Sequence, residues 1–341
     1  MEIGSEFWIE PGLELRTESL ELRGETYVLS GRTAIDLILQ DILKKREVRS
    51  VYMPAWCCDS MLSPFQSRGV EVELYDISFD GELHYHIDAD KTPDIFYVTN
   101  YFGYENTIGE DIIAQFRAKG SVILYDRTHS MLMDDDVKAD YSIASIRKWM
   151  GVVTGAVVSG IEPVNLKNYP HTAIKEMAMK DKFRYLQGDK SIQKEAFLNA
   201  FGEFGHRLVE DYRDYAMDAL SFAIYKNTDL EAMRHQRRAN AQVLHEGLAS
   251  LTSKISPLSS QLSAKSSPLF VPIFFGSKEE RDSVRKKLIE NQIYCPVHWP
   301  KNNLVTPGMA VNRIFDTELS LICDQRYGQK EMEIIINQIN K

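Results

Sequence analysis

A lysine in the middle of the sequence stands where covalent chemistry would be expected. The segment Ser145-Ile146-Arg147-Lys148-Trp149 follows a short apolar stretch, and Gly151 and Gly155 come soon after it. A lysine amine that forms an imine must be neutral when it moves a proton, and burial beside a cation would lower its pKa as required. The Ser145 hydroxyl could bind a phosphate. An isolated Arg-Lys pair is better explained as a solvated basic pair, so Lys148 needs support from other segments.

A carboxylate follows an earlier apolar segment in the same way. Asp126 comes directly after residues 122–125, and His129 stands three positions later. A buried carboxylate needs a cationic partner that offsets its desolvation. The protonated nitrogen of a pyridine ring would be one, and such a ring in pyridoxal 5'-phosphate (PLP) accepts the carbanion charge formed at a substrate Cα. The alternative, a turn-capping Asp126 with a hydrogen-bonded or exposed His129, is about as good for these residues alone.

A phosphate group could be held near residue 30. Ser30-Gly31-Arg32-Thr33 opens a predicted helix, whose free N–H groups and positive dipole end suit an anion. The segment matches neither the P-loop nor the dinucleotide-binding fingerprint. Alone, it is better explained as a hydroxyl N-cap with a glycine at a turn.

An aromatic residue could stack on a bound ring. Pro54-Ala55-Trp56-Cys57-Cys58 directly follows a predicted strand, and Trp56 is the candidate within it. Core packing explains a tryptophan at this position about as well.

A metal site is the weakest of the chemical hypotheses. His84 and His86 share one face of an extended segment near Asp88 and Asp90, which suggests a metal hydrolase. Exposed polar residues explain these histidines better, and neither H-E-x-x-H nor a third spaced ligand is present. We therefore predict no metal, and the absence of G-x-S-x-G disfavours a serine hydrolase.

The candidate residues follow apolar segments that alternate with helical patterns, which is typical of a mostly parallel sheet covered by helices. Open sheets of this kind bind ligands at the carboxyl ends of their strands, where the candidates fall. A helical face is expected at 35–42 and another helix at 108–118. The predicted strands are 26–29, 51–53, 70–74, 95–100, 122–125, 141–145 and 156–159.

The second half of the sequence changes character. Long helical stretches are predicted at 192–225 and 229–251, and a Ser/Lys-rich loop at 251–267. We expect a large three-layer domain over residues 1–228 and a small α+β domain over 229–341. The small domain is predicted to hold a strand at 269–275, a helix at 284–291, short strands near Ile293 and Leu319, and a helix from Gln329.

Composition narrows the class of protein. The 341 residues are 44% hydrophobic and 26% charged, with a net charge of −9, so nucleic acid is an unsuitable partner. No window approaches the roughly 18 apolar residues of a membrane-spanning helix, and no leader-like segment opens the chain, so we expect no membrane association and a cytoplasmic location. Four cysteines without C-x-x-C spacing favour buried thiols.

The order of these motifs resembles the DegT/DnrJ/StrS aminotransferases, a family of fold-type-I PLP-dependent transferases. The resemblance extends to segments 95–103, 229–240, 295–300 and 319–327. It implies a homodimer in which each active site borrows residues from the partner subunit. It also implies Lys148 as the Schiff-base lysine, Asp126 on the pyridine nitrogen, His129 near O3′, and phosphate contacts from Arg32, Thr33 and Ser145.

The implied reaction moves an amino group from an amino acid to a keto substrate, by family habit a (nucleotide-)sugar. Two alternatives stay open. Ile143 and Cys58 stand where many members carry the active-site serine and an aromatic residue, which permits a divergent PLP-binding protein without activity. A PLP-dependent lyase or dehydratase is the other alternative, but members of that type typically have histidine in place of the lysine. Arg213, His298 and Arg326 are candidates for an anionic substrate group.

Overall fold

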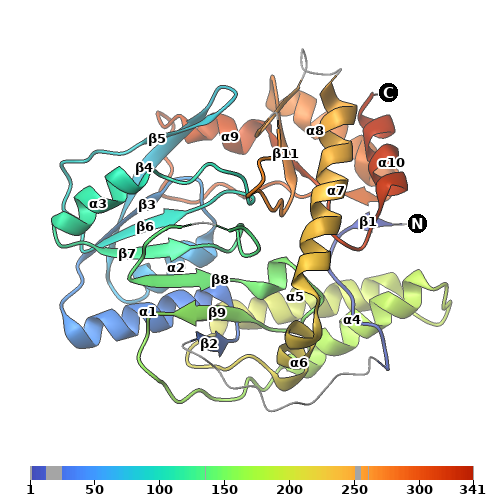
Figure 1. Ribbon diagram of the computed structural model, residues 1–341. Coiled ribbons are helices and arrows are strands. Elements are labelled where there is room, and N and C mark those ends of the chain that lie inside the picture. The colour runs from blue at the N-terminus through green and yellow to red at the C-terminus, as the bar shows by residue number, and fades with distance from the viewer. Residues whose placement is uncertain (1, 13–24, 135, 250–254, 260, 341) are drawn as a thin grey trace.

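The computed structural model of the protein describes residues 2–12, 25–134, 136–249, 255–259 and 261–340. Within them, eight strands form one sheet in the order β2-β9-β8-β7-β6-β3-β4-β5 (Figure 1). The five strands from β8 to β4 are parallel to their neighbours, while β2, β9 and β5 pair antiparallel. The mostly parallel sheet that the sequence predicts is therefore confirmed. Its strands are β2 (Glu25–Val28), β3 (Ser50–Pro54), β4 (Glu71–Phe79), β5 (Leu83–His86), β6 (Ile95–Thr99), β7 (Val122–Asp126), β8 (Tyr141–Ala144) and β9 (Ala156–Ser159).

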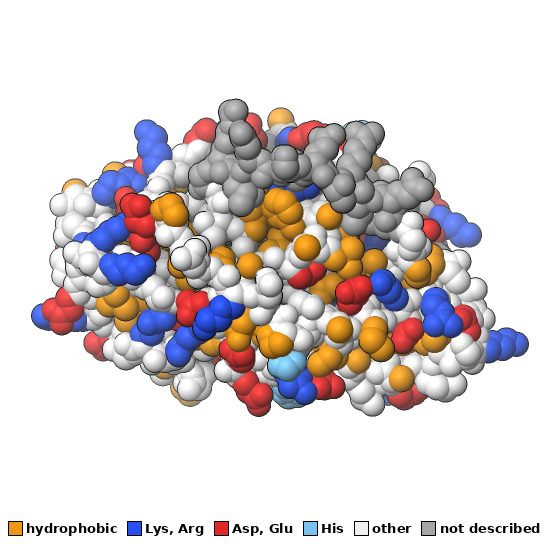
Figure 2. Space-filling view, turned by 90° about the horizontal axis from the view of Figure 1, so that it is seen from below, with side chains coloured by type: hydrophobic (Ala, Val, Ile, Leu, Met, Phe, Trp, Pro, Cys, Tyr) orange, Lys and Arg blue, Asp and Glu red, His pale blue; other side chains and the backbone are white. Residues whose placement is uncertain are grey.

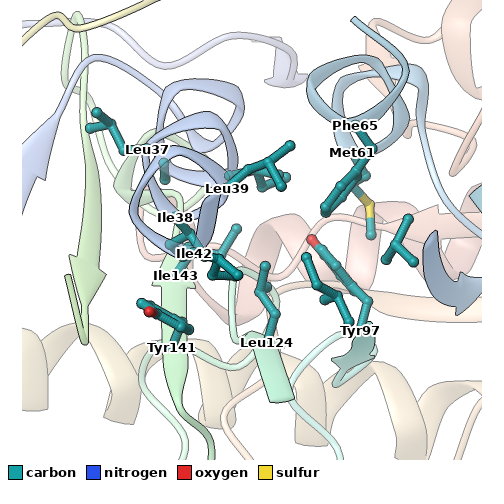
Figure 3. Packing of buried hydrophobic residues seen from close by; sticks show 14 of the residues in the cluster. Leu37, Ile38, Leu39, Ile42, Met61, Phe65, Tyr97, Leu124, Tyr141 and Ile143 are labelled. Atoms are coloured by element: carbon teal, nitrogen blue, oxygen red, sulfur yellow. The ribbon is translucent and has the colours of Figure 1, made fainter. Parts of the chain in front are cut away.

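Helices cover both faces of this sheet, because alternate side chains of its buried strands point to opposite sides. On one side pack α1 (Gly31–Lys45) and α2 (Asp59–Gln66). On the other lies α3 (Glu110–Ala118), whose Phe116 stacks on Phe96 of β6 at 4.0 Å. The result is the expected three-layer arrangement. Figure 3 shows the first side, where Leu37, Ile38, Leu39, Ile42, Met61 and Phe65 meet Tyr97, Leu124, Tyr141 and Ile143.

The prediction of one continuous helical stretch over residues 192–225 is wrong. It forms two helices, α5 (Lys194–Glu210) and α6 (Ala219–Asn227), with residues 211–218 between them. That connection hydrogen bonds along the sheet edge, where Leu29 N–H donates to Tyr215 at 3.0 Å and Met217 N–H donates to Tyr27 at 3.2 Å. Backbone pairing with β2 thus outweighs local helix propensity. Before α5 comes α4 (Thr172–Leu186), which packs against it.

The C-terminal part is built on α7 (Leu230–Leu248) and an antiparallel sheet of order β10-β11-β13. The predicted helix at 284–291 begins earlier, because Ser277 caps it by accepting a hydrogen bond from the N–H of Glu280. A further helix, which the sequence pattern does not predict, precedes β13. Part of the predicted loop, residues 251–254 and 260, lies outside the described residues, and a domain boundary at 228/229 stays a prediction. The elements are β10 (Ile255–Pro257), β11 (Val271–Phe275), α8 (Lys278–Glu290), β12 (Ile293–Tyr294), α9 (Val311–Thr317), β13 (Glu318–Leu321) and α10 (Gln329–Asn340).

A small parallel pair of strands joins the N-terminal segment to the C-terminal part of the chain. Strand β1 (Ile3–Gly4) pairs with β12, placing Ile3 opposite Ile293. The N–H of Gly4 also donates a 2.8 Å hydrogen bond to the Tyr327 hydroxyl. These contacts tie the N-terminal segment to the C-terminal part.

The surface carries both signs of charge. Figure 2 shows acidic and basic side chains interspersed around apolar ones on one face. In the part of the chain that the structure describes, the helices all lack the length and apolarity needed to cross a bilayer.

Candidate active site

A cavity of about 300 Å³ opens at the carboxyl ends of the central strands. Thr99 ends β6, Asp126 ends β7 and Ser145 follows β8, so three adjacent parallel strands deliver side chains to one place. The start of α1 and a short 3₁₀ helix, η1 (Ile146–Lys148), complete this edge. The other lining residues include Glu6, Gly31, Arg32, Cys58, Thr128, His129, Ile143, Arg147, Lys148, Lys175, Leu208 and Trp299.

Lys148 lies at the end of η1, with its side chain exposed in this cavity. The backbone around it is held firmly. Its own N–H donates to Ser145 at 3.2 Å, and the indole N–H of Trp149 donates to the Thr128 carbonyl at 2.6 Å. The guanidinium of Arg237 lies 4.7 Å from the Trp149 ring and donates to its carbonyl. The Lys148 amine is therefore accessible, while the backbone that carries it is fixed by hydrogen bonds.

Asp126 is buried, as predicted, with 5% of its surface exposed. Its carboxylate accepts a 2.7 Å hydrogen bond from the Tyr97 hydroxyl and a 2.8 Å bond from the Thr128 N–H. Burial raises the pKa of Asp126, while these two donors and the nearby Lys148 cation oppose the rise. A cation beside this carboxylate would relieve the remaining desolvation cost.

His129 is also buried and lies in an aromatic setting. Its ring packs 4.7 Å from that of Phe102 and stacks on Trp299 at 5.4 Å. Burial, with smaller contributions from His298 and Lys148, lowers its pKa well below the ordinary value. The imidazole is therefore neutral at pH 7.

Ser30 caps α1 as expected, through a 3.3 Å bond to the N–H of Thr33. Gly31 and Arg32 line the cavity, and Arg32 also donates to the Leu208 carbonyl at 2.9 Å. Thr33 does not line the cavity. Its hydroxyl instead donates to the Tyr212 carbonyl at 2.8 Å, so it fastens a neighbouring loop.

Trp56 is likewise placed away from the cavity, which contradicts the predicted ring contact. Its indole is fully buried, stacks on Tyr101 at 4.5 Å and donates to the His298 carbonyl at 2.5 Å. Trp299 is the tryptophan that lines the cavity. The core-packing alternative for Trp56 is therefore the one that the structure supports.

Three charged residues of the cavity wall are not predicted from the sequence. A solvated basic pair is the simpler interpretation of an isolated Arg147-Lys148, yet Arg147 is only partly exposed and lines the cavity. Lys175, on α4, is buried, and burial together with the Arg147 cation lowers its pKa to about 7. Glu6 reaches the cavity from the N-terminal segment, where Arg326 donates to its carbonyl at 3.1 Å. That these three residues line one cavity can be seen only in the folded chain.

Thr128 was also missed, although it stands two positions after Asp126. Its N–H donates to the Asp126 carboxylate, and its hydroxyl accepts a 3.1 Å bond from the Ser145 N–H. It therefore links the segment that carries the carboxylate to the segment that carries the lysine.

The remaining candidates lie elsewhere. His298 and Arg326 line a second cavity of about 330 Å³ that shares Glu6, Arg147 and Lys148 with the first, and Arg326 is paired with Asp324 at 2.8 Å. Arg213 contacts Ser67 and lines neither cavity.

The two histidines considered for a metal site lie near the surface. His84, on β5, pairs with Asp80 at 2.7 Å, and His86 bonds to Ser78 at 2.8 Å. Among the described residues, no group of three suitable side chains could hold a metal ion.

Comparison with known proteins bears on the fold. No protein-family model and no curated protein matches the sequence. Solved structures do match. One, from Streptococcus pneumoniae, is provisionally described as a sugar aminotransferase in its PLP form, with a TM-score of 0.64 and 17% identity over 92% of this chain and 86% of that one.

Two further structures agree. A DegT DnrJ EryC1 StrS aminotransferase from Brucella abortus has a TM-score of 0.63 and 16% identity, over 93% of this chain and 85% of that one. NtdA from Bacillus subtilis, with bound cofactor PMP, has a TM-score of 0.63 and 18% identity, over 94% and 74%. The chain therefore has the fold of these aminotransferases, the fold-type-I architecture that its sequence predicts.

Proposed function

We propose that the protein is an aminotransferase that uses PLP to move an amino group from an amino acid to a keto substrate. The observation that carries this proposal is that Lys148 and Asp126 line one cavity whose edge is the N-terminus of α1. Bound PLP supplies an aldehyde carbon for amines and a pyridinium ring that accepts the carbanion charge of the substrate.

The residues present fit this cofactor. Asp126 is a buried carboxylate whose desolvation calls for a cation, and the ring N–H would provide one. The helix N-terminus at Gly31 and the Ser145 hydroxyl are donors that suit a phosphate. In the described part of the chain, the buried Nε of Arg32 has no hydrogen-bond partner, as expected of a donor that serves an anion. We therefore assign the ring to Asp126 and the phosphate to the start of α1.

The chemistry of this chain then centres on Lys148. With PLP bound, its amine would hold the cofactor covalently, and once displaced by the donor amino acid it would remove the proton from the substrate Cα. The same amine would then deliver that proton to C4′ of the cofactor. Asp126 would keep the ring nitrogen protonated, while neutral His129, packed against Phe102 and Trp299, is assigned to the O3′ side.

The acceptor that we propose is a keto sugar. The support is the Streptococcus pneumoniae neighbour, which is provisionally described as a sugar aminotransferase.

We also propose a homodimer, for which apolar side chains on α4 and α5 are available: Met177 is 64% exposed, Leu198 42% and Val209 59%. Sedimentation of the purified protein tests the dimer. The cytoplasmic location stays a prediction.

The visible absorbance of purified protein with added PLP tests the function. We expect a band that Lys148→Ala abolishes and that L-glutamate bleaches. Lys180→Ala, at a partly exposed lysine that pairs with Glu176 on α4, is the control and should behave as the wild type. A band that is absent, or unchanged in Lys148→Ala, would refute the assignment. A band that no amino acid bleaches would favour a PLP-binding protein without transferase activity.

A further inference from the structure

Two cations sit together on one wall of the active-site cavity. The guanidinium of Arg147 lies 5.7 Å from the centre of the Phe204 ring, and the Nζ of Lys175 lies 5.5 Å from the same ring. Leu208, one helical turn further along α5, accepts the hydrogen bond of Arg32. The α5 wall therefore gathers three cationic side chains next to the N-terminus of α1.

The charges of this cavity do not balance. Its lining contains four basic side chains, Arg32, Arg147, Lys148 and Lys175, against the carboxylates of Glu6 and Asp126. Burying like charges together is costly unless an anion compensates them. Glu6 is the lining carboxylate that acts electrostatically on both Arg147 and Lys175, and Asp218, outside the lining, also acts on Lys175.

Two of the donors of these side chains are also unused. Among the described residues, the buried Nε atoms of Arg147 and Arg32 lack hydrogen-bond partners. Buried donors are nearly always satisfied in native proteins, so unsatisfied ones that face a cavity indicate a missing acceptor. An acceptor with several oxygens and more than one negative charge would meet both needs.

We infer that Arg147 and Lys175 bind the phosphate group of the cofactor, so that this chain neutralises the phosphate with its own side chains beside the N-terminus of α1. This inference rests on the proposed function. Arg32 and the helix N-terminus supply the remaining donors. The depressed pKa of Lys175 agrees with an amine whose anionic partner is supplied by a ligand.

Pyridoxal lacks the phosphate of PLP, so comparing the affinities of the protein for the two compounds separates phosphate binding from a general effect on the cofactor site. For Lys175→Met and Arg147→Gln we expect the dissociation constant of PLP to rise at least about tenfold, since each loses a charge-assisted hydrogen bond, and that of pyridoxal to change less than about twofold. Lys180→Met on the same helix is the matched control and should change neither. Equal weakening of both compounds, or weakening of neither, overturns the inference.

Inorganic phosphate gives a second readout that needs no cofactor. It should raise the melting temperature of the PLP-free wild type and of Lys180→Met, and should not raise that of Lys175→Met or Arg147→Gln. If phosphate stabilises all of these proteins equally, the subsite is elsewhere. If the variants change only the KM for the amino donor, the two cations bind the donor carboxylate and the inference is wrong.

The two proposals can fail separately. Phosphate protection that depends on Lys175 and Arg147, in a protein that never gives a visible band with PLP, would refute the aminotransferase and keep the anion subsite. A normal band in Lys175→Met, with unchanged PLP affinity, would refute the subsite and keep the aminotransferase.

Discussion

The hydroxyl of Tyr97 donates a 2.7 Å hydrogen bond to the carboxylate of Asp126 across the neighbouring parallel strands β6 and β7. The register places Thr99 opposite Asp126, so Tyr97, two residues earlier, lies on the same face of the sheet and can reach the carboxylate. Burial raises the pKa of Asp126, and this bond is one of the contacts that favour its ionised form. A residue of the hydrophobic core thereby helps to set the charge of the active site.

Tyr97→Phe should therefore impair catalysis more than folding. Loss of a hydrogen bond to a charged group raises the pKa of Asp126 further, and we expect amino transfer to slow by about tenfold at neutral pH. The acid limb of the kcat profile should move to higher pH. Tyr75→Phe, which removes a buried hydroxyl bonded to the Tyr97 carbonyl, is the control. A profile shifted equally in both variants would contradict this role.

The two tryptophans near the cavity should respond in opposite ways. Trp56→Ala removes a fully buried ring and its hydrogen bond, so we expect it to lower the free energy of unfolding by about 3–5 kcal/mol. Trp299→Ala, at a partly exposed residue of the cavity wall, should cost less stability and should weaken PLP binding. Urea unfolding and PLP titration measure the two effects. A stable Trp56→Ala protein that loses PLP would restore the ring-stacking hypothesis.

Glu318 should make stability depend on pH. Burial raises its pKa to about 8, although Ser320 and the N–H of His298 donate to the carboxyl group. The folded protein then holds a proton that the unfolded chain, with a pKa of about 4.3, releases, so this contribution to stability is present at low pH and lost as pH rises through about 8. Replacing the residue with glutamine removes the effect.

We expect Glu318→Gln to gain stability relative to the wild type between about pH 5 and pH 8, by a few kcal/mol at most. Urea unfolding of both proteins across this range checks the slope, with Glu279→Gln, at an exposed position of α8, as the control. A difference that stays constant over the range would mean that Glu318 is ionised in the folded protein.

Two glycines should give opposite results when replaced by alanine. Gly103 has a φ of 77°, and a Cβ there would lie 2.0 Å from the Ser267 carbonyl oxygen, so Gly103→Ala should cost about 2–5 kcal/mol. Gly202, inside α5, has open space around it, so Gly202→Ala should gain up to about 1 kcal/mol. The melting temperature should fall in Gly103→Ala and rise in Gly202→Ala. A tolerated Gly103→Ala would show that the Ser267 segment moves freely.

The parallel sheet, and the side chains that meet at the carboxyl ends of its strands, could be predicted because both follow from the order of strands along the chain. Asp126 and Ser145 each follow an apolar strand, and parallel strands bring their carboxyl ends to one edge. Lys148 comes three positions after Ser145, so it reaches the same edge. These relationships require only the strand pattern.

Other features depend on contacts that the sequence does not display. Lys175 stands in an ordinary helix, and nothing near it shows that α4 turns this side chain toward the cavity. Trp56 and Trp299 both lie near prolines in the sequence. Which of them faces the cavity depends on how the C-terminal part packs against the sheet. The break between α5 and α6 likewise follows from backbone pairing with β2.

The pairing of β1 with β12 has a consequence for the order of synthesis. Gly4 bonds to Tyr327, 323 positions further along, and Glu6, two residues after Gly4, lines the cavity. A ribosome delivers these early residues long before their partners. The N-terminal segment can therefore pair only after the residues up to Tyr327 have left the ribosome, so a nascent chain that is shorter than this lacks the finished cavity wall that contains Glu6.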